Sequence, residues 1–355
     1  MKILLAAPQD KEVLGIIGGY CKKALERLGN EVLVFDFRQH PYPKGKFTSC
    51  LKSRIRTLFP SMPSPYDVSI IKSLTEQKIN RMLFDCVYKF RPDILLVLLG
   101  ENILPQTITK VSQDLGAITL NWFHDSLLLS YRRSFLENIS GFYDYIFIVD
   151  SLEVLRNRDI QAKRIETLAL GCDPEVHRRT ALSPEEIKKY GSDVAFVGTV
   201  TPEREKILEA LADFNLKIWG RWPTESLRLK GCYQKQDIYK EEAVKVYNAS
   251  KVIIDIHGLY GIEKEIFNVT PRVFEVPASG GFLLTNHIPQ VCEFYKVKEE
   301  IITYKDINEL KYLISYYLEH PQERQAISER AYQRAHREHT YLERLRMLLK
   351  TIKKI

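Results

Sequence analysis

Short apolar runs alternate with amphipathic stretches along the first half of the chain. The runs predict strands, and the stretches between them, in which apolar residues recur at helical spacing, predict helices. The expected strands are 3–7, 31–35, 93–99, 118–123, 145–149 and 164–168, and the expected helices are 18–28, 71–89 and 105–115. Continuous apolar strands separated by helices are typical of a parallel sheet covered on both faces. We therefore expect a doubly wound α/β domain over residues 1–172.

The pattern restarts after a polar stretch at 173–190, which is interpreted as a linker. A second α/β domain is expected over residues 191–355. Its expected strands are 193–197, 217–219, 252–256, 282–285 and 301–304, and its expected helices are 202–212, 239–249, 271–279 and those that follow to the C-terminus. The last amphipathic helix can pack back on the N-terminal domain. Two such domains make the cleft between them the default ligand site.

Positive charge is concentrated in one segment. The 355 residues carry a formal net charge of +7, and six cations without a carboxylate fall between Arg38 and Pro65. Such a segment attracts phosphate, as an anionic acceptor or as lipid headgroups; a solvated loop is the other interpretation. The residues assigned to this acceptor or membrane patch are Lys52, Arg54 and Arg56. No nucleic-acid-binding module accompanies it, so nucleic acid is not an expected partner.

The cysteines and the N-terminus bear on the compartment. Six cysteines are scattered without a Cys-x-x-Cys pair, which argues against zinc sites and a disulfide framework. The apolar start, Ile3–Ala7, is too short for a signal peptide or a membrane span. We therefore expect a cytoplasmic protein, and the basic segment is compatible with a peripheral contact at the inner face of a membrane.

The segment 268–281 carries the most chemical information. Thr270 suits an N-cap, Pro271 suits the first helical position and Gly280 suits the left-handed residue after a helix, which together predict a helix over 271–279. Free amides at the positive end of such a helix bind a diphosphate without a metal.

Arg272 and Glu275 lie three residues apart and share a face of this helix. A cation and a carboxylate on one face can hold the phosphates and the ribose hydroxyls of one nucleotide. A structural salt bridge on a capped helix is the alternative. The chain has no Asp-x-Asp for a carboxylate-held metal, no Gly-x-Gly-x-x-Gly for NAD and no Gly-x-Ser-x-Gly.

Several runs of the second half, in this order, resemble the CgeB-like spore-maturation glycosyltransferase family, which is related to glycosyltransferase family 4. The runs are 247–257, 268–275, 280–285, 304–310, 320–321 and 339–344, and the resemblance covers most of 193–350. It implies the GT-B fold, with two Rossmann-like domains facing a cleft. It also implies a UDP-, GDP- or dTDP-linked sugar as donor, with no metal and no cofactor.

The same resemblance implies roles for single residues. Glu275 matches the acid that binds the ribose hydroxyls. Phe267 stands where family 4 has a second Glu, so Asn268 or Glu265 would have to contact the donor sugar. Arg204 follows the tight turn at Gly198 and is available for pyrophosphate, which suits the forked guanidinium. The expected donor-binding residues are Gly18, Gly19, Gly198, Arg204, His257, Asn268, Thr270, Arg272 and Glu275.

In the first half, the glycines at 15–19 look like the glycine-rich loop of family 4 enzymes, placed before a helix; a flexible turn is the alternative. His124 and Asp125 follow a strand at its C-terminal end, where α/β sheets bind ligands. In related enzymes a His here touches the donor sugar, so both residues are catalytic candidates. In an inverting enzyme Asp125 would be the general base. In a retaining one, which we favour, His124 positions the sugar while the leaving diphosphate assists.

The sequence thus predicts a metal-independent glycosyltransferase acting on a saccharide, lipid-linked or protein acceptor. A sugar-nucleotide epimerase on the same fold is one alternative, and it would release an altered nucleotide sugar. A non-catalytic coat or binding protein is another, and Phe267 is the feature that favours it.

Overall fold

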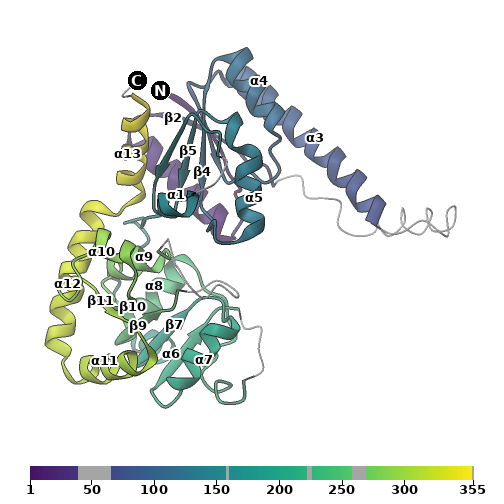
Figure 1. Cartoon of the computed structure of the whole chain (residues 1–355). Coiled ribbons are helices and arrows are strands. Elements are labelled where there is room, and N and C mark those ends of the chain that lie inside the picture. Colours follow the sequence, from purple (N-terminus) through teal and green to yellow (C-terminus); the bar gives the residue numbers. More distant parts are fainter. Residues whose placement is uncertain (39–64, 157–159, 222–225, 258–268, 354–355) are drawn as a thin grey trace. The chain divides into compact units, whose positions relative to one another are not determined.

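The computed structural model describes residues 1–38, 65–156, 160–221, 226–257 and 269–353 (Figure 1). The chain divides into two compact units. The first holds residues 1–125, 134–148 and 157–166, and the second holds 126–133, 149–156 and 167–355. Within the described part, none of the helices combines the length and apolar character that crossing a bilayer requires.

The first unit is built on a six-stranded sheet with strand order β2-β1-β3-β4-β5-β6. Its strands are β1 (Lys2–Ala6), β2 (Glu31–Phe35), β3 (Ile94–Leu98), β4 (Ile118–Phe123), β5 (Tyr145–Ile148) and β6 (Arg164–Thr167). The pairs from β2 to β5 are parallel, and every residue of β3 is buried. The connecting helices are α1 (Val13–Arg27), α3 (Pro65–Phe90), α4 (Pro105–Leu115) and α5 (Ser130–Ile139), with a 3-10 turn at Ser140–Phe142. The first residues of α5, up to 133, and the 3-10 turn at Leu152–Leu155 are grouped with the second unit.

The second unit contains a five-stranded parallel sheet with order β11-β10-β9-β7-β8. Its strands are β7 (Val194–Val197), β8 (Leu216–Trp219), β9 (Val252–Asp255), β10 (Leu283–Asn286) and β11 (Ile302–Tyr304). Its helices are α6 (Pro184–Tyr190), α7 (Pro202–Ala210), α8 (Lys240–Ala249), α9 (Arg272–Ala278), α10 (Pro289–Phe294), α11 (Ile307–Glu319), α12 (Pro321–Glu338) and α13 (Tyr341–Lys353).

Helices cover both faces of this second sheet. Side chains alternate along a strand, so neighbouring residues of β9 serve opposite cores. Ile253 packs in a cluster with residues of α8 and α9, whereas Ile254 packs with residues of α7 and α11. Both units are thus parallel α/β layers, and the expectation of two doubly wound Rossmann-like domains is confirmed.

Two local features differ from the sequence-based expectations. Helix α6 lies inside the stretch interpreted as a linker, where Ser183 and Glu186 form a reciprocal capping box. Helix α1 begins at Val13, five residues before the expected start at Gly18. Packing overrides the low helix propensity of the glycines in its first turns.

Candidate functional site

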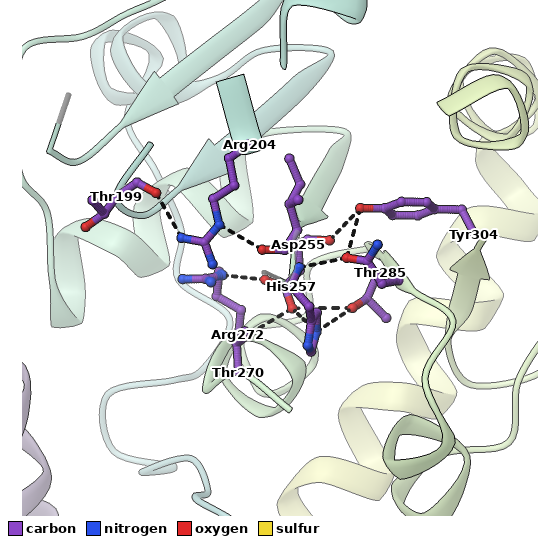
Figure 2. A network of polar contacts seen from close by, with 10 residues as sticks. Thr199, Arg204, Asp255, His257, Thr270, Arg272, Thr285 and Tyr304 are labelled. Carbon is purple, nitrogen blue, oxygen red and sulfur yellow. Dashed lines mark hydrogen bonds and ion pairs between the residues drawn. The ribbon is translucent and has the colours of Figure 1, made fainter. Parts of the chain in front are cut away.

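A buried carboxylate ends the central strand of the second sheet. Asp255 is fully buried, and its oxygens accept hydrogen bonds from the Thr270 hydroxyl at 2.8 Å, Arg272 Nε at 2.7 Å and the Thr285 hydroxyl at 3.3 Å. His257 Nε2 lies 2.7 Å from the same carboxylate. Figure 2 shows these side chains converging on Asp255 from the strand ends and from the start of α9. Ligands of α/β sheets bind at this edge.

The Asp255 carboxylate stays ionised. Burial alone would raise its pKa, but the charges and hydrogen bonds of His257 and Arg272 hold the pKa far below its ordinary range. For Arg272, burial opposes the charge while Asp255 stabilises it, and the pKa is raised. The buried pair therefore keeps both charges at any pH at which the protein is handled.

A second guanidinium lies beside the first. Arg204 donates from Nε to the Ile256 carbonyl at 2.9 Å and from Nη1 to the Thr199 carbonyl at 2.8 Å (Figure 2). Both guanidinium groups lie over the buried ring of Phe196, that of Arg204 at 5.7 Å and that of Arg272 at 5.9 Å from the ring centroid. The two cations are therefore gathered at one aromatic ring at the end of β7.

Gly198 makes room for this arrangement. It has φ +154°, and a Cβ at this position would lie 3.1 Å from Arg272 Nη1. The close approach expected at this turn is therefore made to the guanidinium of Arg272.

The start of α9 differs from the expected capping. Thr270 was expected as N-cap, and this is wrong: the helix begins at Arg272 with Pro271 as its cap residue and no side-chain cap bond. The Thr270 hydroxyl donates to Asp255 instead, because a buried carboxylate is the stronger acceptor and needs its donors. Gly280 follows the helix with φ +80°, as expected.

Glu275 lies on the same helix and is partly open. Its side chain is 23% exposed, and its Oε1 lies 3.7 Å from His177 Nε2. His177 is buried, and its Nδ1 accepts the backbone N–H of Asp173 at 3.0 Å, so its proton lies on Nε2, facing Glu275. Burial raises the pKa of Glu275 to about 7 against the opposing charge of Arg272. Among the described residues the ion-pair partner of Arg272 is Asp255, which argues against a simple Arg272–Glu275 salt bridge.

His124 lies directly after β4 in the first unit. Its ring is 4.8 Å from that of Trp122, and both ring nitrogens are buried without a hydrogen-bond partner among the described residues. Burial lowers the pKa of His124 to about 3, so the ring is neutral and has one donor and one acceptor to offer. Asp125 follows it and is partly buried.

The glycine motif of the first unit lies within α1 and not in a loop before the helix, so that expectation is wrong. A Cβ at Gly18 would lie 3.0 Å from Ala7 Cβ and 3.1 Å from the Pro8 carbonyl, so this glycine lets the helix approach the chain after β1. A Cβ at Gly19 would meet nothing within 4 Å.

Some expected site residues lie outside the described residues. They are Lys52, Arg54, Arg56, Glu265, Phe267 and Asn268. Within the described ranges, no group of three or more His, Cys, Asp or Glu side chains is arranged to hold a metal ion.

Sequence reasoning missed several members of the cluster. Asp255, Thr285 and Tyr304 were not proposed as site residues, although each lies at the C-terminal end of a strand of one sheet. The Tyr304 hydroxyl donates to the Asp255 carbonyl at 2.9 Å (Figure 2). A carboxylate that closes the apolar run of β9 was the available signal.

Comparison with known proteins supports an activity class and a fold. Residues 204–350 match the model of a family described as glycosyl transferase-like. None of the curated protein sequences matches the chain.

Among solved structures, sucrose-phosphate synthase of Thermosynechococcus elongatus superposes with a TM-score of 0.68 at 13% identity, over 100% of this chain and 99% of that one. HepE of Anabaena, solved with UDP and glucose, gives 0.65 at 11% over all of both chains. A glycosyltransferase of Rickettsia africae gives 0.64 at 15%, over 99% of this chain and 98% of that one. These likenesses confirm the GT-B fold. With the family match, they bear out the expectation of an enzyme, and residues 204–350 form the part of the chain that is similar to the glycosyl transferase-like family.

Proposed function

We propose that the protein moves a sugar from a nucleoside diphosphate to an acceptor hydroxyl without a metal, and that the cluster around Asp255 binds the donor. The observation that carries this proposal is the pairing of Arg204 and Arg272 at the ring of Phe196, next to the partly open carboxylate of Glu275. Two cations suit a diphosphate, and a carboxylate suits the two hydroxyls of a ribose.

The two arginines have different tasks in this proposal. Asp255 holds Nε of Arg272 and thereby fixes the plane of the guanidinium, whose terminal nitrogens then face the phosphates. Arg204 is anchored on two carbonyls through Nε and Nη1, so it contributes charge at a fixed position. Both stabilise the charge that develops on the leaving diphosphate, where fixed cations assist most.

His124 is proposed to hydrogen-bond a hydroxyl of the donor sugar, because its neutral ring has two unpartnered, buried nitrogens. A buried polar group without a partner is costly, and a bound sugar would remove that cost. With retention of configuration, His124 and the leaving diphosphate suffice. With inversion, Asp125 would be the base.

UDP is the first nucleotide to test, because HepE was solved with UDP and with UDP-glucose. The CgeB-like family stays our proposal for the subtype, resting on the motifs of residues 247–344.

The test is thermal unfolding of the protein with UDP, GDP, dTDP and ADP. A ligand that binds only the folded state stabilises it by RT ln(1 + [L]/Kd), about 2.7 kcal/mol at a hundredfold excess over Kd. We expect at least one diphosphate to raise Tm in the presence of EDTA. If none of them does so at millimolar concentration, the proposed donor site is wrong.

A further inference from the structure

Glu275 makes the ribose contact in the proposed donor site, and the arginine of its own helix is engaged elsewhere. Arg272, three residues earlier on α9, donates from Nε to Asp255. Among the described residues, His177 is the side chain that forms an ion-pair contact with Glu275. Ordering a flexible side chain on binding costs affinity. A residue that holds the Glu275 carboxylate in place beforehand therefore strengthens binding.

The His177 ring presents a single N–H to this carboxylate. Its Nδ1 accepts the backbone N–H of Asp173 at 3.0 Å, which leaves the proton on Nε2, and Nε2 lies 3.7 Å from Glu275 Oε1. Burial lowers the pKa of His177 to about 4, so the ring is neutral at neutral pH. The contact thus joins a neutral donor to a carboxylate, and hydrogen bonds in binding sites often shorten when the substrate is bound.

The backbone holds the His177 ring in place. The N–H of His177 donates to the Asp173 carbonyl at 2.7 Å, and this bond closes one turn. The residue before that turn, Cys172, is tied to the junction of α12 and α13: its N–H donates to the His339 carbonyl and its carbonyl accepts the N–H of Tyr341, both at 2.9 Å. The position of the imidazole N–H is therefore set by segments that do not belong to α9.

The carboxylate can serve His177 and a ribose together. An ionised carboxylate has about four lone-pair sites, so one hydrogen bond from Nε2 leaves room for two hydroxyl donors. The side chain of Glu275 is 23% exposed, whereas that of His177 is 3% exposed. A ligand can thus reach the carboxylate, while the imidazole contacts it from within the protein.

We propose that His177 is a positioning residue whose Nε2–H holds the Glu275 carboxylate in the orientation that accepts the two ribose hydroxyls. This inference rests on the proposed donor site and deepens it, because the selectivity of the site for a ribonucleotide then depends on a residue outside α9. His177 contacts no substrate itself and acts through Glu275.

Two substitutions separate the two nitrogens of the ring. His177→Asn places an amide oxygen near the position of Nδ1, so Asp173 keeps its acceptor while the donor to Glu275 is lost. His177→Gln places an amide N–H near the position of Nε2, so the donor is kept and the acceptor for Asp173 is lost. The readout is the Kd for 2′,3′-dideoxy-UDP divided by the Kd for UDP, from calorimetric titration in EDTA at about pH 8, where Glu275 is ionised. The two ligands differ only in the ribose hydroxyls.

We expect wild type to bind UDP more tightly than 2′,3′-dideoxy-UDP. His177→Asn should lower this selectivity about fivefold, the effect of about one hydrogen bond, by weakening UDP binding alone. His177→Gln should keep the selectivity although its Tm falls, because the N–H of Asp173 loses its acceptor. In Glu275→Ala protein, His177→Asn should change neither Kd. His320→Asn is the matched control, because His320 is exposed between α11 and α12, and it should not change the selectivity.

Unchanged selectivity in His177→Asn overturns the inference. An equal loss of selectivity in His177→Gln also overturns it, because that result assigns the ring to the support of the turn. His177→Leu, which lacks the donor as well, replaces His177→Asn if the latter does not fold. A wild-type protein that binds both ligands equally removes the ribose contact from Glu275 and overturns the inference with it. A wild-type protein that binds neither ligand contradicts the proposed donor site itself.

Discussion

Glu275→Gln should stabilise the free protein at alkaline pH while weakening nucleotide binding. The pKa of this carboxyl rises from an ordinary 4.5 to about 7 on folding, so the unfolded chain releases the proton first. The unfolded state then binds fewer protons, and stability falls as pH rises from about 4.5 through about 7. At 1.36 kcal/mol for each pKa unit, the loss is about 3 kcal/mol above that range, an upper limit because the side chain is 23% exposed.

Glutamine carries no charge and escapes this loss. At about pH 8 the variant should therefore be more stable by up to about 3 kcal/mol, and at about pH 4.5 the two proteins should be equal. The same substitution turns charge-assisted hydrogen bonds to ribose hydroxyls, worth about 1.5 to 3 kcal/mol, into neutral ones worth about 0.5 to 1.5 kcal/mol. The difference of about 1 to 1.5 kcal/mol should raise the Kd for the nucleotide roughly tenfold.

The assay is urea unfolding at both pH values, combined with calorimetric titration of UDP. Glu319→Gln is the matched control, because Glu319 is an exposed residue of α11, and it should alter neither quantity. A variant that is less stable than wild type at about pH 8 would show that the charged form of Glu275 supports the fold. An unchanged Kd would remove Glu275 from the donor site.

Three further predictions address other parts of the account. Asp255→Asn leaves the Arg272 charge buried and uncompensated, so the free energy of unfolding in urea should fall by about 3 to 5 kcal/mol. Asp213→Asn, in an exposed ion pair with Arg228, should lower it by at most about 1 kcal/mol. Equal losses of stability in the two variants would contradict a buried Asp255–Arg272 pair. His124→Phe removes two unpartnered buried nitrogens, so Tm should not fall while the transfer rate drops about tenfold or more; an unchanged rate would show that His124 does not touch the sugar. Replacing Lys52, Arg54 and Arg56 by Gln should raise the acceptor KM and leave donor hydrolysis unchanged. The difference in KM between variant and wild type should shrink as salt shortens the Debye length from about 10 Å to about 3 Å. Equal losses in the transfer and hydrolysis assays would show that the segment supports the folded structure and not acceptor binding.

The sheets could be predicted because most of the central strands are largely apolar runs. A run such as Ile94–Leu98, in which every residue is buried, is typical of a strand inside a parallel sheet. The start of α1 could not be predicted, because its glycines have low helix propensity. The close approach of Gly18 to Ala7 is a tertiary contact, which the local sequence does not reveal.

The cluster around Asp255 was partly predictable. Arg272 and Glu275 follow from their spacing on one helix. Apart from His257, the partners of Asp255 come from segments 15 to 49 residues away, and no local sequence pattern predicts such long-range contacts. The role of the Thr270 hydroxyl could not be predicted either. Its sequence context favours a helix N-cap, but in the structure the hydroxyl donates a hydrogen bond to the buried carboxylate of Asp255.

The most direct test of the account is the release of nucleoside diphosphate from UDP-, GDP- and dTDP-linked sugars, measured with EDTA and with Mg²⁺. If the arginines at Phe196 hold the diphosphate, at least one sugar nucleotide should be consumed, with transfer to an acceptor or to water, at the same rate in both conditions. Consumption of none of them, or consumption that stops in EDTA and returns with Mg²⁺, would contradict it.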